Sequence, residues 1–304
     1  MKGRFAPSPT GTLHVGNLRT ALLAWLFARS DGARFLVRME DLDRVTSSVA
    51  HEHEQLADLT ALGLDWDGEV IRQSERFDRY RRAIDELTDA GLTYPCYCSR
   101  REIREAASAP HATTAAGSAP EGAYPGTCRD LTDVQRAERL AGGRPAAIRL
   151  RTGHERVTFR DRLRGEVTGI ADDVVLSRND GVPAYHLAVV VDDAAQGVTE
   201  VVRGDDLLSS TPSQIHLAHL LRLPVPVYAH VPLVLGPDGQ RLAKRHGAVT
   251  LGDLAAQGVD RHAVRAMLAA SLCLCEPNER PGLAELLQRF DPADLPDQPW
   301  TFTG

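Results

Sequence analysis

Lysine is nearly absent from this chain of 304 residues, which has 35 basic residues of which only Lys2 and Lys244 are Lys. Because Arg serves almost everywhere else, a retained flexible ammonium such as that of Lys244 is what a chemical role would produce. Acidic residues outnumber basic ones, giving a formal net charge of −6. This balance excludes a uniformly basic coat for nucleic acid, although a local basic face is still compatible with it.

Long apolar runs are lacking as well. The run from Ala21 to Ala28 is far shorter than the roughly 20 residues that a bilayer requires. The first residues lead into a Pro-rich turn without the apolar segment of a signal peptide. We therefore expect a cytoplasmic protein with no membrane partner, and the length predicts about two domains.

Cysteine is scarce and odd in number, with five residues, three of which fall between residues 96 and 128. Without a secretion signal, metal binding is favoured over disulfides. Between Cys98 and Cys128 lies the segment 106–126, in which 18 of 21 residues are Ala, Gly, Pro, Ser or Thr, and we expect a long loop there. Cys273 and Cys275 fall in a helical pattern and are predicted to be core thiols.

A structural zinc would hold the ends of this loop together. In an extended segment, residues i and i+2 point to one side, so Cys96 and Cys98 can share an ion with Cys128. His111 is one candidate for the fourth ligand. The alternative is a set of unrelated reduced thiols.

The order of elements predicts an α/β fold with parallel strands. We expect strands at 4–6 and 34–39 and a helix between them that ends at Asp31-Gly32. A second helix, capped by Ser47 or Ser48, runs to about Leu62, and a third is capped by Ser74 and ends at Gly91.

The second half is predicted to resume after an inserted module that runs from about Cys96 to Asn179. We expect buried strands at 184–191, 198–203 and 227–235, a helix at 212–221 and helical structure over 251–275. The tail after Glu276 is Pro-rich and acidic.

The turn from Pro7 to Asn17 lies where a strand gives way to a helix, the place where open α/β sheets bind ligands. A helix N-terminus offers N–H groups and a positive dipole end to phosphate. Gly11 and Gly16 permit close approach, and His14 and Asn17 can donate to phosphoryl oxygens. The alternative is a Pro-rich turn with a surface His.

These residues carry a family resemblance. The segments Arg4-Phe-Ala-Pro-Ser-Pro-Thr-Gly11, His14-Val-Gly-Asn17 and Arg19-Thr-Ala-Leu22 resemble the glutamyl branch of the class I aminoacyl-tRNA synthetases, and His14 to Asn17 is similar to their HIGH motif. Further segments extend the resemblance over about residues 3–260: Arg38-Met-Glu-Asp-Leu-Asp43, Tyr185-His-Leu-Ala188 and Val202-Arg-Gly-Asp-Asp-Leu207. It implies a Rossmann-like class I catalytic core with an inserted zinc-bearing module and a small helical C-terminal part.

The resemblance implies ATP-dependent activation of glutamate. Arg241-Leu-Ala-Lys-Arg245 resembles the KMSKS loop, with Lys244 at the ATP-contacting lysine; Arg241 and Ala243 depart from the motif, and Ala243 lacks its hydroxyl. A solvated basic loop is the alternative. The implied catalytic residues are His14, Asn17 and Lys244, and Mg²⁺ is expected with the ATP. The implied ATP-binding residues are Pro9, Thr10, Gly11, His14, Gly16, Asn17, Leu242 and Lys244.

The resemblance also implies which residues form the glutamate pocket. The resemblance implies a lining of Arg4, Ala6, Ser8, Glu40, Tyr185 and Arg203. The chemistry agrees, since Arg suits a carboxylate and Glu40 suits an ammonium. The alternative for Glu40 alone is a helix cap or a surface acid, and the alternative for Arg203 alone is a surface ion pair.

A truncated branch of this family, the glutamyl-Q tRNA(Asp) synthetases, is similar in its Cys-x-Cys…Tyr-x-x-x-Cys pattern. That pattern implies the zinc ligands Cys96, Cys98, Tyr124 and Cys128, with His111 as the alternative to Tyr124. Only 60 residues follow Lys244, which is too few for an anticodon-binding domain. The expected organisation is a catalytic domain over 1–95 and 180–240, the insert over 96–179, and a helical region over 241–304.

The same resemblance implies the acceptor. After activation without tRNA, glutamate would be esterified to queuosine in the anticodon of tRNA(Asp), by an enzyme expected to be a monomer. The alternatives are a glutamate-activating enzyme with another acceptor and a non-catalytic RNA-binding paralogue.

Overall fold

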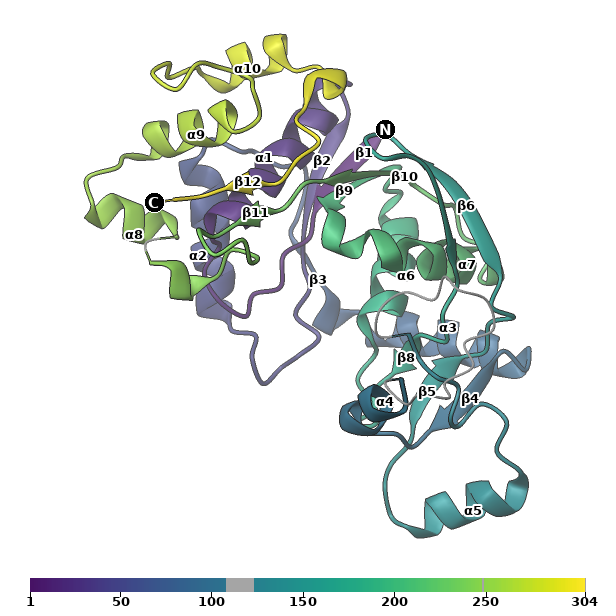
Figure 1. The fold of residues 1–304 in the computed structure, drawn as a ribbon. Helices are drawn as coiled ribbons and strands as arrows, with labels where there is room; N and C mark the ends of the chain where they lie inside the picture. Colours follow the sequence, from purple (N-terminus) through teal and green to yellow (C-terminus); the bar gives the residue numbers. More distant parts are fainter. Residues whose placement is uncertain (108–122, 248, 304) are drawn as a thin grey trace.

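The computed structural model describes residues 1–107, 123–247 and 249–303. Its first half is built on β1 (Lys2–Phe5), β2 (Arg34–Met39) and β3 (Ile71–Arg72), which pair in parallel in that order. The long helix α1 (Val15–Ser30) connects β1 to β2 and is buried along most of its length (Figure 1). A helix that is apolar on nearly all sides requires cover all round, and α1 therefore lies at the centre of the largest hydrophobic cluster.

A second, mixed sheet has the strand order β7-β6-β10-β9. Its strands are β6 (Arg156–Asp161), β7 (Gly165–Ile170), β9 (Glu200–Gly204) and β10 (Val227–Val231). β10 is parallel to both β6 and β9, whereas β6 and β7 form an antiparallel hairpin. The N–H of Thr199 donates to the carbonyl of Lys2 over 2.9 Å, which places the start of β9 beside β1. The two sheets thus adjoin, and the strand predictions at 4–6, 34–39 and 198–203 are confirmed within a residue or two.

One predicted strand is a helix. The segment 184–191 lies in α6 (Tyr185–Gln196), not in a buried strand. Its Val run favours a strand by local propensity, but Gly197 adopts a left-handed conformation at φ +66° and ends a helix of twelve residues. α6 packs with α7 (Thr211–Leu220), which confirms the helix predicted at 212–221, and η2 (Asp205–Ser210) leads into α7.

The two helices after β2 differ in how their N-termini are capped. α2 (Val49–Ala61) is capped by Ser48, whose hydroxyl accepts the N–H of His51 over 3.1 Å, as predicted. α3 (Phe77–Asp89) begins after Arg76, so the predicted cap at Ser74 is wrong. Ser74 lies instead in η1 (Gln73–Glu75), where its N–H and hydroxyl both donate to the Asp41 carboxylate. The acid therefore competes successfully for the hydroxyl that would otherwise cap the helix.

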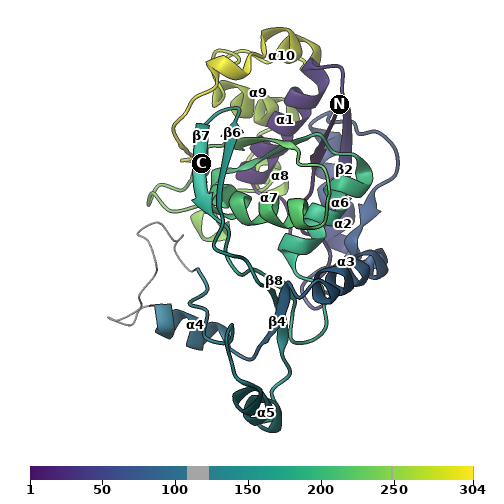
Figure 2. The ribbon, with the colours of Figure 1, turned by 90° about the vertical axis from the view of Figure 1, so that its right-hand side faces the viewer.

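A small antiparallel sheet is formed by β4 (Thr93–Cys96), β5 (Ala147–Leu150) and β8 (Val175–Ser177). α4 (Arg100–Ala107) and α5 (Asp133–Ala141) accompany it, and α5 lies at the opposite end of the molecule from α10 in two perpendicular views (Figures 1 and 2). Most of the predicted loop at 106–126, including His111, lies outside the described residues.

The region after β10 is a set of short elements. β11 (Val234–Leu235) precedes η3 (Lys244–His246), and the helices α8 (Leu251–Ala256), α9 (Arg261–Ala270) and α10 (Leu283–Arg289) follow. The predicted helical stretch 251–275 is thus two helices, because the Asp260 carboxylate caps a new start at α9. After η4 (Pro292–Asp294), β12 (Trp300–Thr301) pairs in parallel with β11.

The two cysteines after α9 differ in their surroundings. Cys273 is exposed and has φ +61° in the turn that follows the helix, whereas Cys275 is partly buried and packs against the main hydrophobic cluster. The prediction of core thiols is therefore wrong for Cys273, and neither residue is helical, since α9 ends at Ala270. Within the described ranges, no helix combines the length and apolar character that spanning a membrane demands.

Candidate functional site

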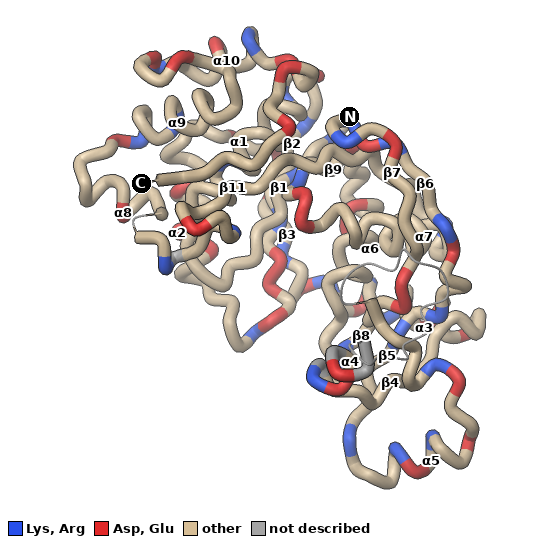
Figure 3. The backbone as a smooth tube through the Cα atoms, in the orientation of Figure 1, with Lys and Arg blue, Asp and Glu red and all other residues tan. Residues whose placement is uncertain are grey.

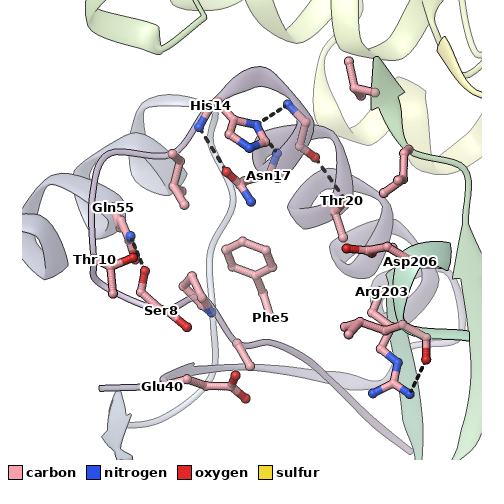
Figure 4. A pocket seen from close by; sticks show the side chains of 18 of the residues that line it. Phe5, Ser8, Thr10, His14, Asn17, Thr20, Glu40, Gln55, Arg203 and Asp206 are labelled. Atoms are coloured by element: carbon pink, nitrogen blue, oxygen red, sulfur yellow. Dashed lines mark hydrogen bonds between the residues drawn. The ribbon is translucent and has the colours of Figure 1, made fainter. Parts of the chain in front are cut away.

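A cavity of about 590 Å³ opens where β1, β2 and β9 end and α1 begins. Arg4, Glu40 and Arg203 lie at the carboxyl ends of these three strands, the usual ligand-binding edge of an open α/β sheet. Figure 4 shows His14 and Asn17 at one end of the cavity in that view, with Glu40 and Arg203 at the other. Of the residues predicted from sequence, the following line it: Arg4, Ala6, Ser8, Thr10, Gly11, His14, Gly16, Asn17, Glu40, Tyr185 and Arg203.

Three predicted site residues are placed differently. Pro9 is buried in the turn before α1 and Leu242 is buried in the main core, and neither belongs to the cavity lining. Lys244 begins η3, but its side chain lies outside the part of the chain that the structure describes.

His14 caps α1 through its ring. Nδ1 accepts the N–H groups of Gly16 and Asn17 over 3.1 and 3.3 Å, and the Asn17 side-chain oxygen accepts the N–H of His14 over 3.2 Å. A Cβ on Gly16 would come within 3.0 Å of the ring, so glycine lets the imidazole lie flat over the first turn. With Nδ1 acting as acceptor, the proton of the neutral ring resides on Nε2.

Burial, and secondly the positive charge of Arg241, lowers the pKa of His14 to about 4. The ring is therefore neutral at physiological pH and offers one N–H donor rather than a cation.

The N–H groups at the start of α1 are already paired. Val15 donates to the carbonyl of Val249 over 2.7 Å, while Gly16 and Asn17 donate to His14. The expectation that these groups are free for phosphate is therefore wrong. What α1 presents to the cavity is its dipole, the Nε2–H of His14 and the amide nitrogen of Asn17.

Arg203 is a buried cation with neutral partners. Its Nε donates to His230 over 3.1 Å, and its two terminal nitrogens donate to Gln214 over 2.7 Å and to Thr211 over 2.8 Å. Its accessible fraction is 5%, and no carboxylate among the described residues forms an ion pair with it. A buried guanidinium without a counter-ion makes the cavity strongly attractive to an anion.

Glu40, in contrast to Arg203, is a carboxylate with cationic neighbours. Its carboxylate contacts the guanidinium of Arg38 at 3.4 Å, and Arg38 in turn donates to Asp193 over 2.8 Å. Asp193 also pairs with Arg4 at 3.4 Å. Burial raises the pKa of Glu40, although Arg38 and Arg4 oppose that rise. A buried carboxylate in this state gains most from a second cation, such as an ammonium.

Tyr185 is the first residue of α6 and lines the same cavity. Burial raises the pKa of its hydroxyl, and the negative charge of Glu40 adds to the effect. The phenol therefore stays protonated and serves as a hydrogen-bond donor.

Sequence reasoning missed two features of the cavity wall. Gln55 of α2 donates to the carbonyls of Ser8 and Gly11 over 3.0 and 2.7 Å, which fixes the turn before α1. Asp206 pairs with Arg241 at 2.5 Å and connects η2 to the loop that contains Lys244. Asp206 belongs to the quoted Arg-Gly-Asp-Asp segment, which was a usable signal, whereas nothing in the α2 pattern marks Gln55.

The cysteine cluster forms a second candidate site at β4. The Sγ atoms of Cys96, Cys98 and Cys128 lie within 4.8 Å of one another. The hydroxyl oxygen of Tyr124 lies 3.3 Å from Sγ of Cys96 and 3.7 Å from Sγ of Cys98. Ligands of a tetrahedral zinc stand about 3.8 Å apart when the Zn–S bonds are about 2.3 Å, so these donors suit such an ion.

A cation beside the cysteine cluster also supports a metal site. The Arg149 guanidinium stacks on the Tyr124 ring at 3.7 Å, and its Nε is buried without a hydrogen-bond partner. Thiolates are the metal-binding form of cysteine, and a neighbouring cation stabilises them.

The fold and these two sites define an α/β enzyme core whose cavity suits an anionic substrate, and comparison with known proteins gives the family. The model of the tRNA synthetases class I (E and Q), catalytic domain, matches residues 1–281. The chain therefore belongs to this family of class I tRNA synthetases. Its catalytic fold is that of the glutamyl members, as predicted.

Individual relatives narrow the comparison. The chain is 62% identical over 301 residues to a glutamyl-Q tRNA(Asp) synthetase of Nocardia farcinica, covering 99% of this chain and 93% of that protein. It is 40% identical to a glutamate–tRNA ligase of Aquifex aeolicus, of which it covers 64%. A crystal structure of a glutamate tRNA ligase from Elizabethkingia meningosepticum, in complex with its amino acid, superimposes with a TM-score of 0.81 at 26% identity, covering 99% of this chain and 67% of that chain.

Proposed function

We propose that this protein activates L-glutamate with ATP in the absence of tRNA and then transfers the glutamate to queuosine in the anticodon of tRNA(Asp). The observation that carries the first step is the cavity itself, which is lined both by Arg203, a buried cation with no ion-pair partner among the described residues, and by the largely buried carboxylate of Glu40. Glutamate matches this arrangement, because its side-chain carboxylate meets Arg203 and its ammonium meets Glu40. The name of the 62% identical relative supports the acceptor.

The activation step forms one bond and breaks one. An oxygen of the substrate's α-carboxylate attacks the α-phosphorus of ATP, the bond between the α-phosphorus and the bridging oxygen breaks, and pyrophosphate leaves. His14 and Asn17 would donate to the phosphoryl oxygens as charge moves onto them, and the dipole of α1 favours the same charge. We assign Lys244 to the pyrophosphate side because of its position in the loop after β11.

The nucleotide end of the cavity would hold ATP through the turn and the loop that flank α1. For this role we retain the assignment of Thr10, Gly11 and Gly16, while Pro9 and Leu242, which do not line the cavity, would shape the turn and the loop. Among the described cavity residues, Glu40 and Asp206 carry carboxylates, and each already pairs with an Arg. Mg²⁺ would therefore enter on the phosphates of the nucleotide rather than in a protein cage.

The transfer step uses the adenylate. A hydroxyl of the queuosine cyclopentenediol attacks the glutamyl carbonyl, an ester forms, the bond to the phosphate breaks, and AMP leaves while the hydroxyl proton is lost to solvent. Basic and acidic residues are interspersed along α5 (Figure 3), so an RNA-binding face on this net-acidic protein would have to be local.

The insert would be held by a structural zinc. Cys96, Cys98, Cys128 and Tyr124 would supply the ligands, and the ion would tie β4 to the far end of the intervening segment. We propose the same four-part organisation as above, with catalytic segments 1–95 and 180–240, the insert 96–179 and the helical region 241–304. A reduced thiol cluster of this kind suits a cytoplasmic protein, and we expect a monomer.

Two assays test the proposal. Glutamate-dependent exchange of pyrophosphate into ATP, measured without tRNA, separates an active enzyme from a non-catalytic RNA-binding paralogue. Transfer of labelled glutamate to tRNA(Asp) with and without queuosine then separates this acceptor from another one. The proposal predicts exchange in the first assay and labelling of the queuosine-containing tRNA alone in the second; the absence of exchange would refute it.

A further inference from the structure

Behind Arg203 lies a buried pair of an acid and an imidazole that does not line the cavity. The Asp161 carboxylate accepts a hydrogen bond from Nδ1 of His230 over 2.6 Å, and both side chains are fully buried. The other ring nitrogen, Nε2, accepts from Nε of Arg203 over 3.1 Å. The chain of contacts therefore runs from Asp161 through one imidazole to the guanidinium that faces the cavity.

The tautomer of His230 decides whether this chain holds. Arg203 has only donors, so Nε2 must present a lone pair to it, and the ring proton must reside on Nδ1. A carboxylate opposite Nδ1 enforces this arrangement, because it only accepts. Burial and the charge of Arg203 lower the pKa of His230 although Asp161 opposes them, which keeps the ring neutral.

Asp161 is itself locked in place. Its second oxygen accepts the N–H groups of Leu163 and Arg164 over 2.9 and 3.0 Å. Burial would raise the pKa of Asp161, but the hydrogen bonds from His230 and these N–H groups hold the pKa below its usual value. The carboxylate is thus a fixed, ionised acceptor.

We propose that Asp161 and His230 are positioning residues that set the tautomer and orientation needed to aim Arg203 at the side-chain carboxylate of the substrate. This inference rests on the proposed function. It also assigns a role to the β6–β7 hairpin, because Asp161 ends β6, a strand of the predicted insert that pairs with β10, and β10 contains His230. The insert would thereby contribute to amino-acid recognition without touching the substrate.

The central test is Asp161→Asn. An amide can donate to Nδ1, so the ring proton moves to Nε2 and faces the Nε–H of Arg203, donor against donor. The loss of a hydrogen bond to a charged group predicts a glutamate KM raised roughly ten- to a hundredfold, with the ATP KM unchanged. Long-range ¹H–¹⁵N spectra of ¹⁵N-histidine-labelled protein report the tautomer directly.

Two variants at His230 distinguish its contact with Arg203 from its contact with Asp161. In His230→Gln the side-chain oxygen reaches the place of Nε2 and can accept from Arg203, whereas in His230→Asn the amide stays near Asp161 and falls short of Arg203. We expect His230→Gln to retain a glutamate KM much closer to that of the native protein than His230→Asn does. Asp173→Asn is the matched control, because Asp173 is a buried acid hydrogen-bonded to Tyr94 and Thr152.

The outcomes distinguish failure of the proposed function from failure of the positioning role. If the unmodified protein lacks glutamate-dependent exchange, the proposed function fails while the tautomer shift in Asp161→Asn still stands. If the protein is active and the tautomer shifts, but the glutamate KM does not change, the positioning role is overturned. An unshifted tautomer overturns it equally. Equal losses in Asp161→Asn and Asp173→Asn, in both KM values and in Tm, would indicate a purely structural role.

Discussion

Nδ1 of His14 accepts the N–H of Gly16 over 3.1 Å, so a single imidazole caps α1 with one nitrogen and leaves the other for the cavity. The capping role and the donor role of His14 can be separated by mutation. The side-chain oxygen of an asparagine can accept at the place of Nδ1, but asparagine has no donor at the place of Nε2.

His14→Asn is therefore expected to keep the helix cap and lose the donor. Pyrophosphate exchange should fall by about 10²–10³-fold, the usual cost of removing one preorganised donor. The Tm should stay near that of the native protein, whereas His14→Ala should also lower the free energy of unfolding by about 1 kcal/mol because the cap is gone. Equal thermal losses in both variants would contradict the capping role.

Arg203→Ala is expected to raise the glutamate KM by about a hundredfold, since it removes charged hydrogen bonds to the substrate. Arg203→Lys keeps the charge but loses the planar fork, and should recover only part of the affinity. Steady-state exchange kinetics at varied glutamate and varied ATP provide the measurement. Arg81→Ala, at an exposed site of α3, is the control, and unchanged kinetics in Arg203→Ala would exclude the pocket assignment.

The raised pKa of Glu40 predicts an unusual pH dependence. Only the ionised carboxylate attracts the ammonium, so kcat/KM for glutamate should decline as the pH falls through the Glu40 pKa, at a pH above the usual value of about 4.3. The stability tied to this group is present in full below the unfolded pKa and is lost as the pH rises through the folded pKa. Glu40→Gln should therefore unfold at higher denaturant concentration at neutral pH while binding glutamate poorly.

The cysteine cluster predicts one zinc ion per chain. Metal analysis of purified protein should find it, and Cys128→Ser should lose it, since three thiolates and a phenol oxygen suit tetrahedral zinc. Replacement by Co²⁺ should give the thiolate charge-transfer bands of a tetrahedral site. Tyr124→Phe tests the fourth ligand: full metal retention would favour His111. Cys273→Ser, at an exposed thiol, is the control.

His246 is expected to hold the loop that contains Lys244. Its Nδ1 accepts the N–H of Ala243 over 3.0 Å, its Nε2 lies 3.1 Å from the Asp238 carboxylate, and a Cβ on Gly236 would strike the ring at 2.7 Å. His246→Ala should raise the ATP KM and lower kcat while leaving the glutamate KM unchanged, because the loop loses its anchor. His246→Asn, which keeps an acceptor near Ala243, should be the milder variant.

Much of the fold follows from local pattern, and the errors have identifiable causes. A cap at Ser47 or Ser48 was predictable, and the Ser48 hydroxyl accepts the helix N–H of His51, whereas Ser74 lost that role to Asp41, thirty-three residues away. The strand expected at 184–191 rested on β-branched residues, and Gly197 was the signal for a helix end. Tertiary context overrode local propensity in both cases.

The cavity could be predicted only in part. Motif residues at the strand ends, such as Arg4 and Glu40, come together as expected. The capping of Gly16 and Asn17 by His14 is local, whereas the bond from Val15 to Val249 and the support of Arg203 by His230 depend on contacts over long sequence separations. No periodicity or spacing encodes such contacts, so the sequence alone could not specify them.

The parallel pairing of β12 with β11 has a consequence for biosynthesis. Phe302 is buried, and Phe290 lies edge-on against Phe27 of α1 at 5.1 Å between ring centres. The helix that follows His14 leaves the ribosome long before the aromatic residues that close its core. The catalytic half therefore cannot finish folding as soon as it is made, and its exposed apolar helix must be shielded until the segment that contains Phe290 and Phe302 arrives.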